Sequence, residues 1–213
     1  MTAPLFLGAG LLVLALAWLG PLPLLAARFF TAHMTVHMAV VAIAAPLLAI
    51  GCAVGRFDMT RYFPSVFSPV PASAVELIVV WAWHAPALHQ LARASATGFA
   101  CEQLLFLLAG YLVWMSSLGG DARHGGGRAG AGVVALLLTS MHMTLLGALL
   151  ALSPRPLYVH ANLAGLPPLD PLVDQHIGGV MMLLVGGFSY LAGGLWLSSA
   201  LLRTGRTAPV EHR

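Results

Sequence analysis

The stretch that decides the fold is residues 30–50, FTAHMTVHMAVVAIAAPLLAI. It contains no charged residue, and it is long enough to cross a lipid bilayer as one helix, which takes about 20 mostly apolar residues. His33 and His37 lie one helical turn apart within it, so their side chains share one face. Met34 and Met38 form a parallel stripe beside them. Because an ionisable residue at membrane depth is costly, these histidines indicate a functional site.

The rest of the chain has the composition of a membrane protein. Of its 213 residues, 59% are hydrophobic and only 8% are charged, and the mean hydropathy is +0.89. A soluble domain would have about a quarter of its residues charged. The apolar stretches lie near residues 4–20, 30–50, 72–92, 98–118, 129–152 and 172–202. With short connections between them, they predict an all-α integral membrane protein, a single polytopic domain over residues 1–213 built as one bundle of about six transmembrane helices.

Arginine supplies all ten basic residues, and its distribution predicts the orientation of the helices. Seven arginines fall on one side of the predicted bundle, namely Arg56, Arg61, Arg123, Arg128, Arg203, Arg206 and Arg213. The other side has Arg28, Arg93 and Arg155. Cytoplasmic loops of membrane proteins are enriched in basic residues, so we expect both termini in the cytoplasm. The formal charge of +3 gives no indication of nucleic-acid binding.

Prolines predict bends in two of these helices. Pro46 predicts a kink near the inner end of the second helix. Pro86 deprives the carbonyl of Ala82 of its usual partner and predicts a bend in the third helix. His84 is expected at this bend, in the outer third of the membrane. His89 is expected closer to water and solvated, as are His124 and His212 outside the spans.

Histidines on different helices fall at a common depth in this topology. Those in the outer half of the bilayer are His33, His37, His84, His142 and His176, with Glu102 and Asp174 at the same level. Nothing forces helices of opposite direction to place their histidines together, so a convergent site explains the pattern better than separate accidents. The alternative for any one of them is a hydrogen bond across a helix interface.

Imidazole and thioether ligands together suit copper better than hard cations. We therefore predict a copper site, with the metal as Cu(I), and its candidate ligands are His33, His37, His84, His142, His176, Met34, Met38, Met143 and Asp174. Asp174 and Glu102 are candidates to orient imidazoles. Each methionine, Met181 included, is equally consistent with core packing. Cys101 could be a soft ligand or a small buried residue.

Several motifs together resemble the multi-pass CtaG-type family of cytochrome c oxidase assembly factors. They are His33-Met34-x-x-His37-Met38 before Pro46-Leu47-Leu48, Trp83-His84-x-Pro86-x-Leu88, the His142 helix ending in Pro156-Leu157-Tyr158, and Asp174-Gln175-x-x-Gly178-Gly179-x-Met181-Met182. The chain differs at Glu102-Gln103, where the family pattern often has Glu-His. The resemblance implies a bacterial inner-membrane protein with a role in maturing a haem–copper oxidase.

The function expected from these patterns is that of a non-enzymatic assembly factor that binds copper and helps to insert it into a terminal oxidase. Its partners would be oxidase subunits or other copper chaperones. The main alternative is a membrane haem protein for electron transfer, because paired histidines on facing helices also hold haem. A copper transporter is a third possibility, although Glu76 is the only acid in the inner half of a span. A homo-oligomer could form through a glycine face that includes Gly179, Gly186 and Gly193.

Overall fold

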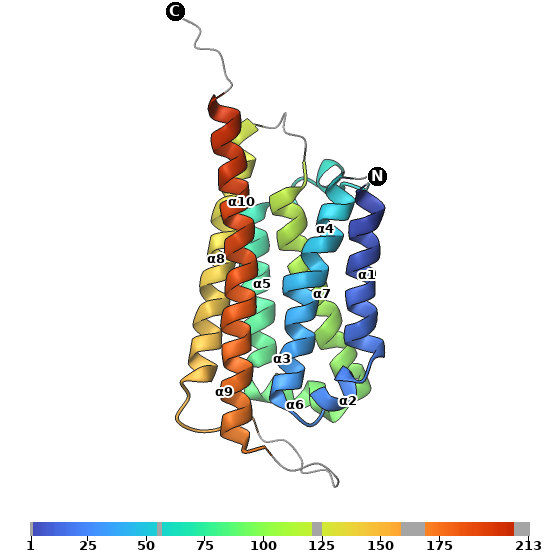
Figure 1. Ribbon diagram of the computed structural model, residues 1–213, viewed down its shortest axis with the longest axis vertical. Helices are drawn as coiled ribbons and strands as arrows, with labels where there is room; N and C mark the ends of the chain where they lie inside the picture. The colour runs from blue at the N-terminus through green and yellow to red at the C-terminus, as the bar shows by residue number, and fades with distance from the viewer. Residues whose placement is uncertain (1, 55–56, 121–124, 159–168, 207–213) are drawn as a thin grey trace, which may run out of the picture.

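The computed structural model describes residues 2–54, 57–120, 125–158 and 169–206, and every element within them is a helix (Figure 1). In chain order the helices are α1 (Ala3–Leu19), α2 (Leu22–Ala26), α3 (Phe30–Met38), η1 (Ala39–Ala44), α4 (Ala45–Val54), η2 (Met59–Arg61), α5 (Pro69–His84), α6 (Pro86–Ala94), α7 (Ala96–Leu118), α8 (Gly125–Ala151), α9 (Pro171–Met181), η4 (Met182–Gly186) and α10 (Gly187–Arg206). The predictions for His124, His212, Arg56, Arg123 and Arg213 lie outside the described residues.

Several of these helices are suited to a membrane. Those long and apolar enough to cross one are Phe30–Val54, Ala96–Leu118, Gly127–Ala151 and Pro171–Arg203. α5 and α6 pass the same test together, as a broken span or a re-entrant loop, and α1 is a shorter apolar helix of 17 residues. Large apolar side chains point outward, as Leu12 and Leu195 do, each 60% exposed. The predicted fold class, an all-α membrane protein of about six spanning helices, is therefore confirmed.

The two ends of the bundle differ, as Figure 1 shows. We call the end where α1 begins and α10 ends the terminal end. The opposite end, where the short helices α2 and α6 lie, is the histidine end. The side of the membrane on which each end lies remains a prediction from the arginines.

Two of the long helices contain a π-helical segment, η1 in one and η4 in the other, and these segments contact each other. Pro46 lies two residues after the end of η1 and has no N–H to offer the carbonyl of Ala42. The hydroxyl of Ser189 donates to that carbonyl instead, at 2.7 Å. The sequence predicts a kink at Pro46, and the structure has a π-helical segment just before it, with a neighbouring helix supplying the missing donor.

Pro86 breaks the third predicted helix. Ala85, directly before it, has φ −64° and ψ 134°, the extended conformation that a following proline imposes. The carbonyl of Ala82 accepts from the N–H of Ala85 at 3.1 Å, so the helix closes there. α5 and α6 meet at 72°. The break lies three residues after the predicted bend at Ala82, and it turns α6 across the histidine end.

The glycine face of α9 and α10 packs inside the chain. A Cβ at Gly179 would lie 2.5 Å from the backbone nitrogen of Ala151 in α8, and one at Gly193 would lie 2.6 Å from the ring of Trp114. Such close approach is what small residues permit in membrane helices. The face is therefore a seam within one chain and is not available to a second copy.

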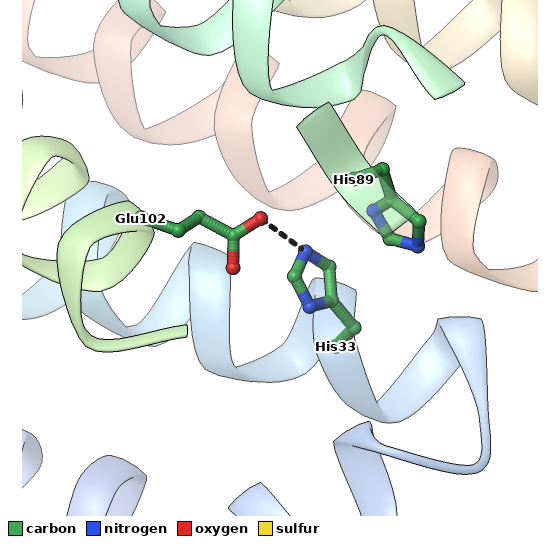
Figure 2. A group of neighbouring side chains, drawn as sticks. All are labelled: His33, His89 and Glu102. Carbon is green, nitrogen blue, oxygen red and sulfur yellow. Dashed lines mark ion pairs between the residues drawn. The ribbon is translucent and has the colours of Figure 1, made fainter. Parts of the chain in front are cut away.

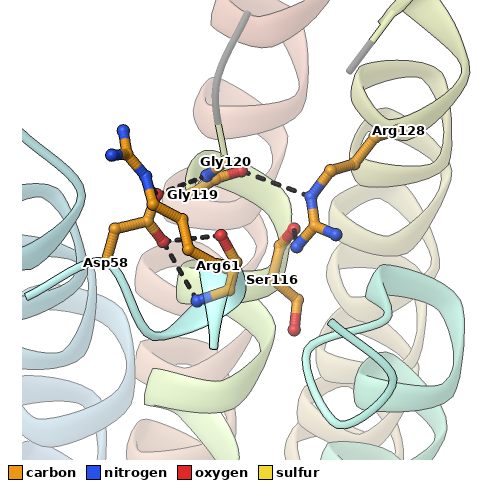
Figure 3. Close-up of polar contacts among 7 residues, drawn as sticks. Asp58, Arg61, Ser116, Gly119, Gly120 and Arg128 are labelled. Atoms are coloured by element: carbon orange, nitrogen blue, oxygen red, sulfur yellow. Dashed lines mark hydrogen bonds and ion pairs between the residues drawn. The ribbon is translucent and has the colours of Figure 1, made fainter. Parts of the chain in front are cut away.

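A polar clasp closes the terminal end (Figure 3). The carboxylate of Asp58 accepts hydrogen bonds from the backbone of Thr60 at 3.0 Å and of Gly120 at 2.8 Å, and Arg61 lies 3.3 Å away. Arg128 donates to three backbone carbonyls, those of Phe67, Ser116 and Gly119. Gly120 has φ +96°, a conformation that favours glycine.

Candidate metal centre

Three buried ligand atoms converge at the histidine end (Figure 2). They belong to His33 on α3, His89 on α6 and Glu102 on α7, and all lie within 4.8 Å of one another. Nε2 of His33 is 3.4 Å from Oε1 of Glu102. None of the three residues is more than 1% exposed. We call this group the metal trio, because two imidazoles and a carboxylate from three helices form a common ligand set for a transition metal.

His89 reaches the trio through the break at Pro86. α6 is turned across the bundle, so His89 points inward and lies edge-on to the ring of His33, with centroids 4.8 Å apart. Phe30 and Tyr158 also pack against it. The prediction that His89 is solvated was wrong, because it assumed that α6 continued towards water. The amphipathic pattern of α6, with His89 and Ala92 on one buried face, is the signal that could have indicated this.

Glu102 is oriented by its neighbour in the chain. The amide of Gln103 donates to Oε2 of Glu102 at 3.2 Å, and its own oxygen accepts from the indole of Trp18 at 3.4 Å. Gln103, at the position where the family pattern often has histidine, thus supports the carboxylate from the side. Cys101, the other candidate in this segment, is exposed.

A second pair of imidazoles lies one helical turn deeper than the trio. The rings of His37 and His84 meet edge to face with centroids 5.2 Å apart, and Phe106 packs on His37. Nδ1 of His84 is 2.6 Å from the carbonyl of Val80, which can only accept, so Nδ1 carries the proton and Nε2 has a free lone pair. Within the described residues, neither this Nε2 nor either ring nitrogen of His37 has a hydrogen-bond partner.

The predicted methionine ligands lie on a different side of α3. A Cβ at Gly178 of α9 would lie 3.0 Å from Cγ of Met34, and one at Gly186 would lie 3.4 Å from Sδ of Met38. Met143 lies against the same Gly186. These side chains fill the interface of α3 and η1 with α9 and η4, as core methionines do. Their role as metal ligands stays a prediction.

His142 on α8 is 3% exposed, and neither of its ring nitrogens has a hydrogen-bond partner within the described part of the chain. It does not join the trio.

Asp174 and His176 have structural hydrogen bonds at the same end. The carboxylate of Asp174 accepts from the backbone of Phe30 at 2.6 Å and of Thr31 at 3.0 Å, so it caps the start of α3. Nε2 of His176 is 2.9 Å from the carbonyl of Ser153. Asp174 therefore positions the helix that carries His33 and His37, and His176 joins α9 to the end of α8.

Comparison with known proteins gives the same family as the sequence motifs do. The sequence model of the family described as cytochrome c oxidase caa3 assembly factor (Caa3_CtaG) matches residues 2–204. No curated protein and no solved structure matches the chain. The family match spans nearly the whole chain, including the three helices that carry the metal trio. The chain therefore belongs to the cytochrome c oxidase caa3 assembly factor family.

Proposed function

We propose that this assembly factor holds a copper ion between His33, His89 and Glu102 and passes it to cytochrome c oxidase during assembly of the oxidase. Family membership supports the role in oxidase assembly. The copper part of the proposal rests on one observation, the convergence of three buried ligand atoms from three separate helices. The chain would bind and release the ion without catalysing a reaction.

The spacing of the trio suits a single ion. Two ligand atoms at about 2.1 Å from one metal can be no more than about 4.2 Å apart. The 3.4 Å between His33 and Glu102 already lies within this limit. Ligand atoms as far apart as 4.8 Å would have to approach by less than about 1 Å to bind one ion. A metal ion bound between two imidazoles and a carboxylate would offset the cost of burying the charged carboxylate.

The pair His37 and His84 supports a second position for the ion. It lies one turn further along α3 and contains no carboxylate, so it suits a softer ion than the trio does. Imidazoles at successive turns would let copper move by exchange of one ligand at a time. Such stepwise exchange is what a carrier needs if it is to release the metal again.

Electron transfer through a bound haem is less well supported. A bis-histidine haem between His37 and His84 would have to separate rings that meet edge to face with centroids 5.2 Å apart. The ring of Phe106 already packs on His37, with centroids 4.0 Å apart. A spectrum of the purified protein tests this alternative, because haem gives a strong Soret band.

Passage of copper through the bundle is a second candidate, favoured by a buried polar layer between the histidines and the terminal end. Glu76 on α5 is fully buried and accepts a hydrogen bond from the hydroxyl of Tyr190. The hydroxyls of Ser73 and Thr139 lie 3.0 Å apart beside this layer. Copper uptake into vesicles containing the purified protein tests this function. Uptake that is lost in Glu76→Gln, without loss of copper binding, would favour transport over delivery.

Metal binding by the detergent-purified protein tests the main proposal. We expect the wild type to bind copper, tested as Cu(I) and Cu(II), more tightly than zinc. The double variant His33→Ala/His89→Ala should lose at least tenfold in copper affinity. His176→Ala is the matched control, because this histidine lies at the same end but binds the carbonyl of Ser153. Full copper affinity in the double variant would overturn the proposal.

A further inference from the structure

A cavity of about 190 Å³ adjoins the metal trio at the histidine end. It lies between α2, α3, α6 and α7, and His33 and Arg93 are the ionisable residues that line it. The remaining walls are Ser95 and the side chains of alanine, proline and phenylalanine residues. His33 thus has one face in the trio and another on the cavity, so an ion held by the trio would be reachable from it.

Arg93 lines this cavity, and two of its three nitrogens have no acceptor among the described residues. It lies one helical turn beyond His89 on α6, so the two side chains share a face. Its Nε and Nη1 atoms are buried and have no hydrogen-bond partner among the described residues. A guanidinium only donates hydrogen bonds, and leaving its N–H groups buried without acceptors is costly.

The nearby carboxylates are already engaged. Glu102 and Asp174 both act electrostatically on Arg93. However, Asp174 accepts from the start of α3, and Glu102 faces His33 and Gln103. A cation held by the trio would also repel the guanidinium beside it. An anion in the cavity, between the metal and Arg93, would remove this repulsion and supply the missing acceptors.

We propose that this cavity binds a small carboxylate anion, which pairs with Arg93 and completes the ligand shell of the copper ion held by the trio. The inference rests on the proposed function. A carboxylate fits because it pairs with guanidinium through two parallel hydrogen bonds, and its oxygen is a copper ligand. The trio supplies three ligands, and a site that exchanges its metal keeps a further position open.

The cavity restricts the anion in size and charge. It is smaller than the roughly 300–1,000 Å³ of a typical small-molecule site, so it suits an anion of a few non-hydrogen atoms. Its lining includes no acidic side chain, so it does not favour cations. Alanine, proline and phenylalanine walls suit a short apolar part behind the carboxylate.

The test is the copper affinity of the full-length purified protein, in both oxidation states, with acetate or acetamide at constant ionic strength. Acetamide has the shape of acetate without its charge. We expect acetate to raise the affinity of the wild type for at least one oxidation state about fivefold or more, and acetamide to have no effect. Arg93→Gln should abolish the acetate effect while still binding copper, and Arg93→Lys should keep part of it.

Arg155→Gln is the matched control, because Arg155 is an exposed arginine outside the cavity. It should respond to acetate as the wild type does. Acetate also binds free copper in solution, to the same extent for every variant. The test therefore compares the effect of acetate on copper affinity between variants. The anion site alone is overturned if acetate does not change the copper affinity of the wild type, or if acetate raises the copper affinity of Arg93→Gln as much as that of the wild type. Failure to bind copper in every condition overturns the proposed function and this inference with it.

Discussion

The two ends of the bundle differ in how their nitrogen-bearing and charged side chains are paired. At the terminal end, the carboxylate of Asp58 and the guanidinium of Arg128 have hydrogen-bond partners in the backbone around them. At the histidine end, nitrogens of His37, His84 and Arg93 are buried without a partner among the described residues. An unpaired buried polar group costs roughly 1–3 kcal/mol, and under our proposal a bound ligand would offset this cost at the histidine end.

The largest effect should come from removing the metal trio in cells. With His33→Ala/His89→Ala in place of the wild type, we expect oxidase subunits and haem to be made but the oxidase to lose most of its copper. The measurement is the copper-to-haem ratio of the purified oxidase. Cells with His176→Ala should give a normal ratio. A normal ratio in the double variant would remove the link between the trio and the oxidase.

Changes to the pair His37 and His84 should have a smaller effect on copper binding than changes to the trio, and the two effects should be separable. We expect a second equivalent of copper to bind more weakly than the first, and His37→Ala to lower the affinity of this second step by about tenfold or more. Titration of the purified protein with copper measures both steps. Met38→Leu, a change of similar volume next to His37, should keep both. Loss of both steps in Met38→Leu would instead favour a thioether ligand.

We expect a substitution in the glycine seam to change the stability of the protein without changing its affinity for copper. Gly179→Ala would place a Cβ 2.5 Å from the backbone of α8, and such overpacking costs about 2 kcal/mol. Gly8→Ala, where no atom lies within 4 Å of the added Cβ, should be neutral or slightly stabilising. Reversible unfolding in mixed micelles compares the two variants. Equal stability would mean that α8 and α9 can separate at little cost.

The smallest effect should come from the clasp at the terminal end and should depend on pH. Burial opposes the ionisation of Asp58, but hydrogen bonds from Thr60 and Gly120 and the charge of Arg61 prevail and lower its pKa. A lowered pKa means that the contribution to stability is present above the pKa of the unfolded state, about 3.9, and is lost as the pH falls through the folded value.

We therefore expect Asp58→Asn to reduce stability by about 1 kcal/mol at pH 7. The difference from the wild type should shrink when the pH approaches 3. Thermal unfolding followed by circular dichroism at both pH values measures this. Copper affinity should not change, because Asp58 lies at the opposite end from the trio. A difference that grows on acidification would contradict the assignment of the clasp.

The sequence was enough to predict the fold class, and it named the histidines on α3 and α5 that the structure places near one another. Uninterrupted apolar stretches identify the spanning helices, and the spacing of His33 and His37 places both on one face. The break at Pro86 was foreseen, but its angle was not, because a proline removes a hydrogen bond without specifying the direction in which the chain continues. His89 was missed for that reason.

The remaining differences between the predicted and the observed site concern the residues that a side chain contacts. Met34 and Met38 alternate with the histidines in sequence, yet they face α9 and η4, because residues one apart on a helix point in different directions. Asp174 looked like a partner for an imidazole, but it caps α3 instead, a contact across about 140 residues that no local pattern contains. From the sequence, Arg93 contributed only to the prediction of orientation. Its position beside His33 could not be predicted, because it depends on the angle between α5 and α6.

Copper X-ray absorption spectroscopy of the purified protein tests the metal trio most directly, because it identifies the atoms bound to the ion. With one equivalent of copper, we predict nitrogen and oxygen neighbours with the scattering pattern of imidazole and no sulfur. The imidazole contribution should fall in His89→Ala and remain unchanged in His176→Ala. Sulfur neighbours, or a wild-type spectrum in His89→Ala, would contradict the assignment of the site to His33, His89 and Glu102.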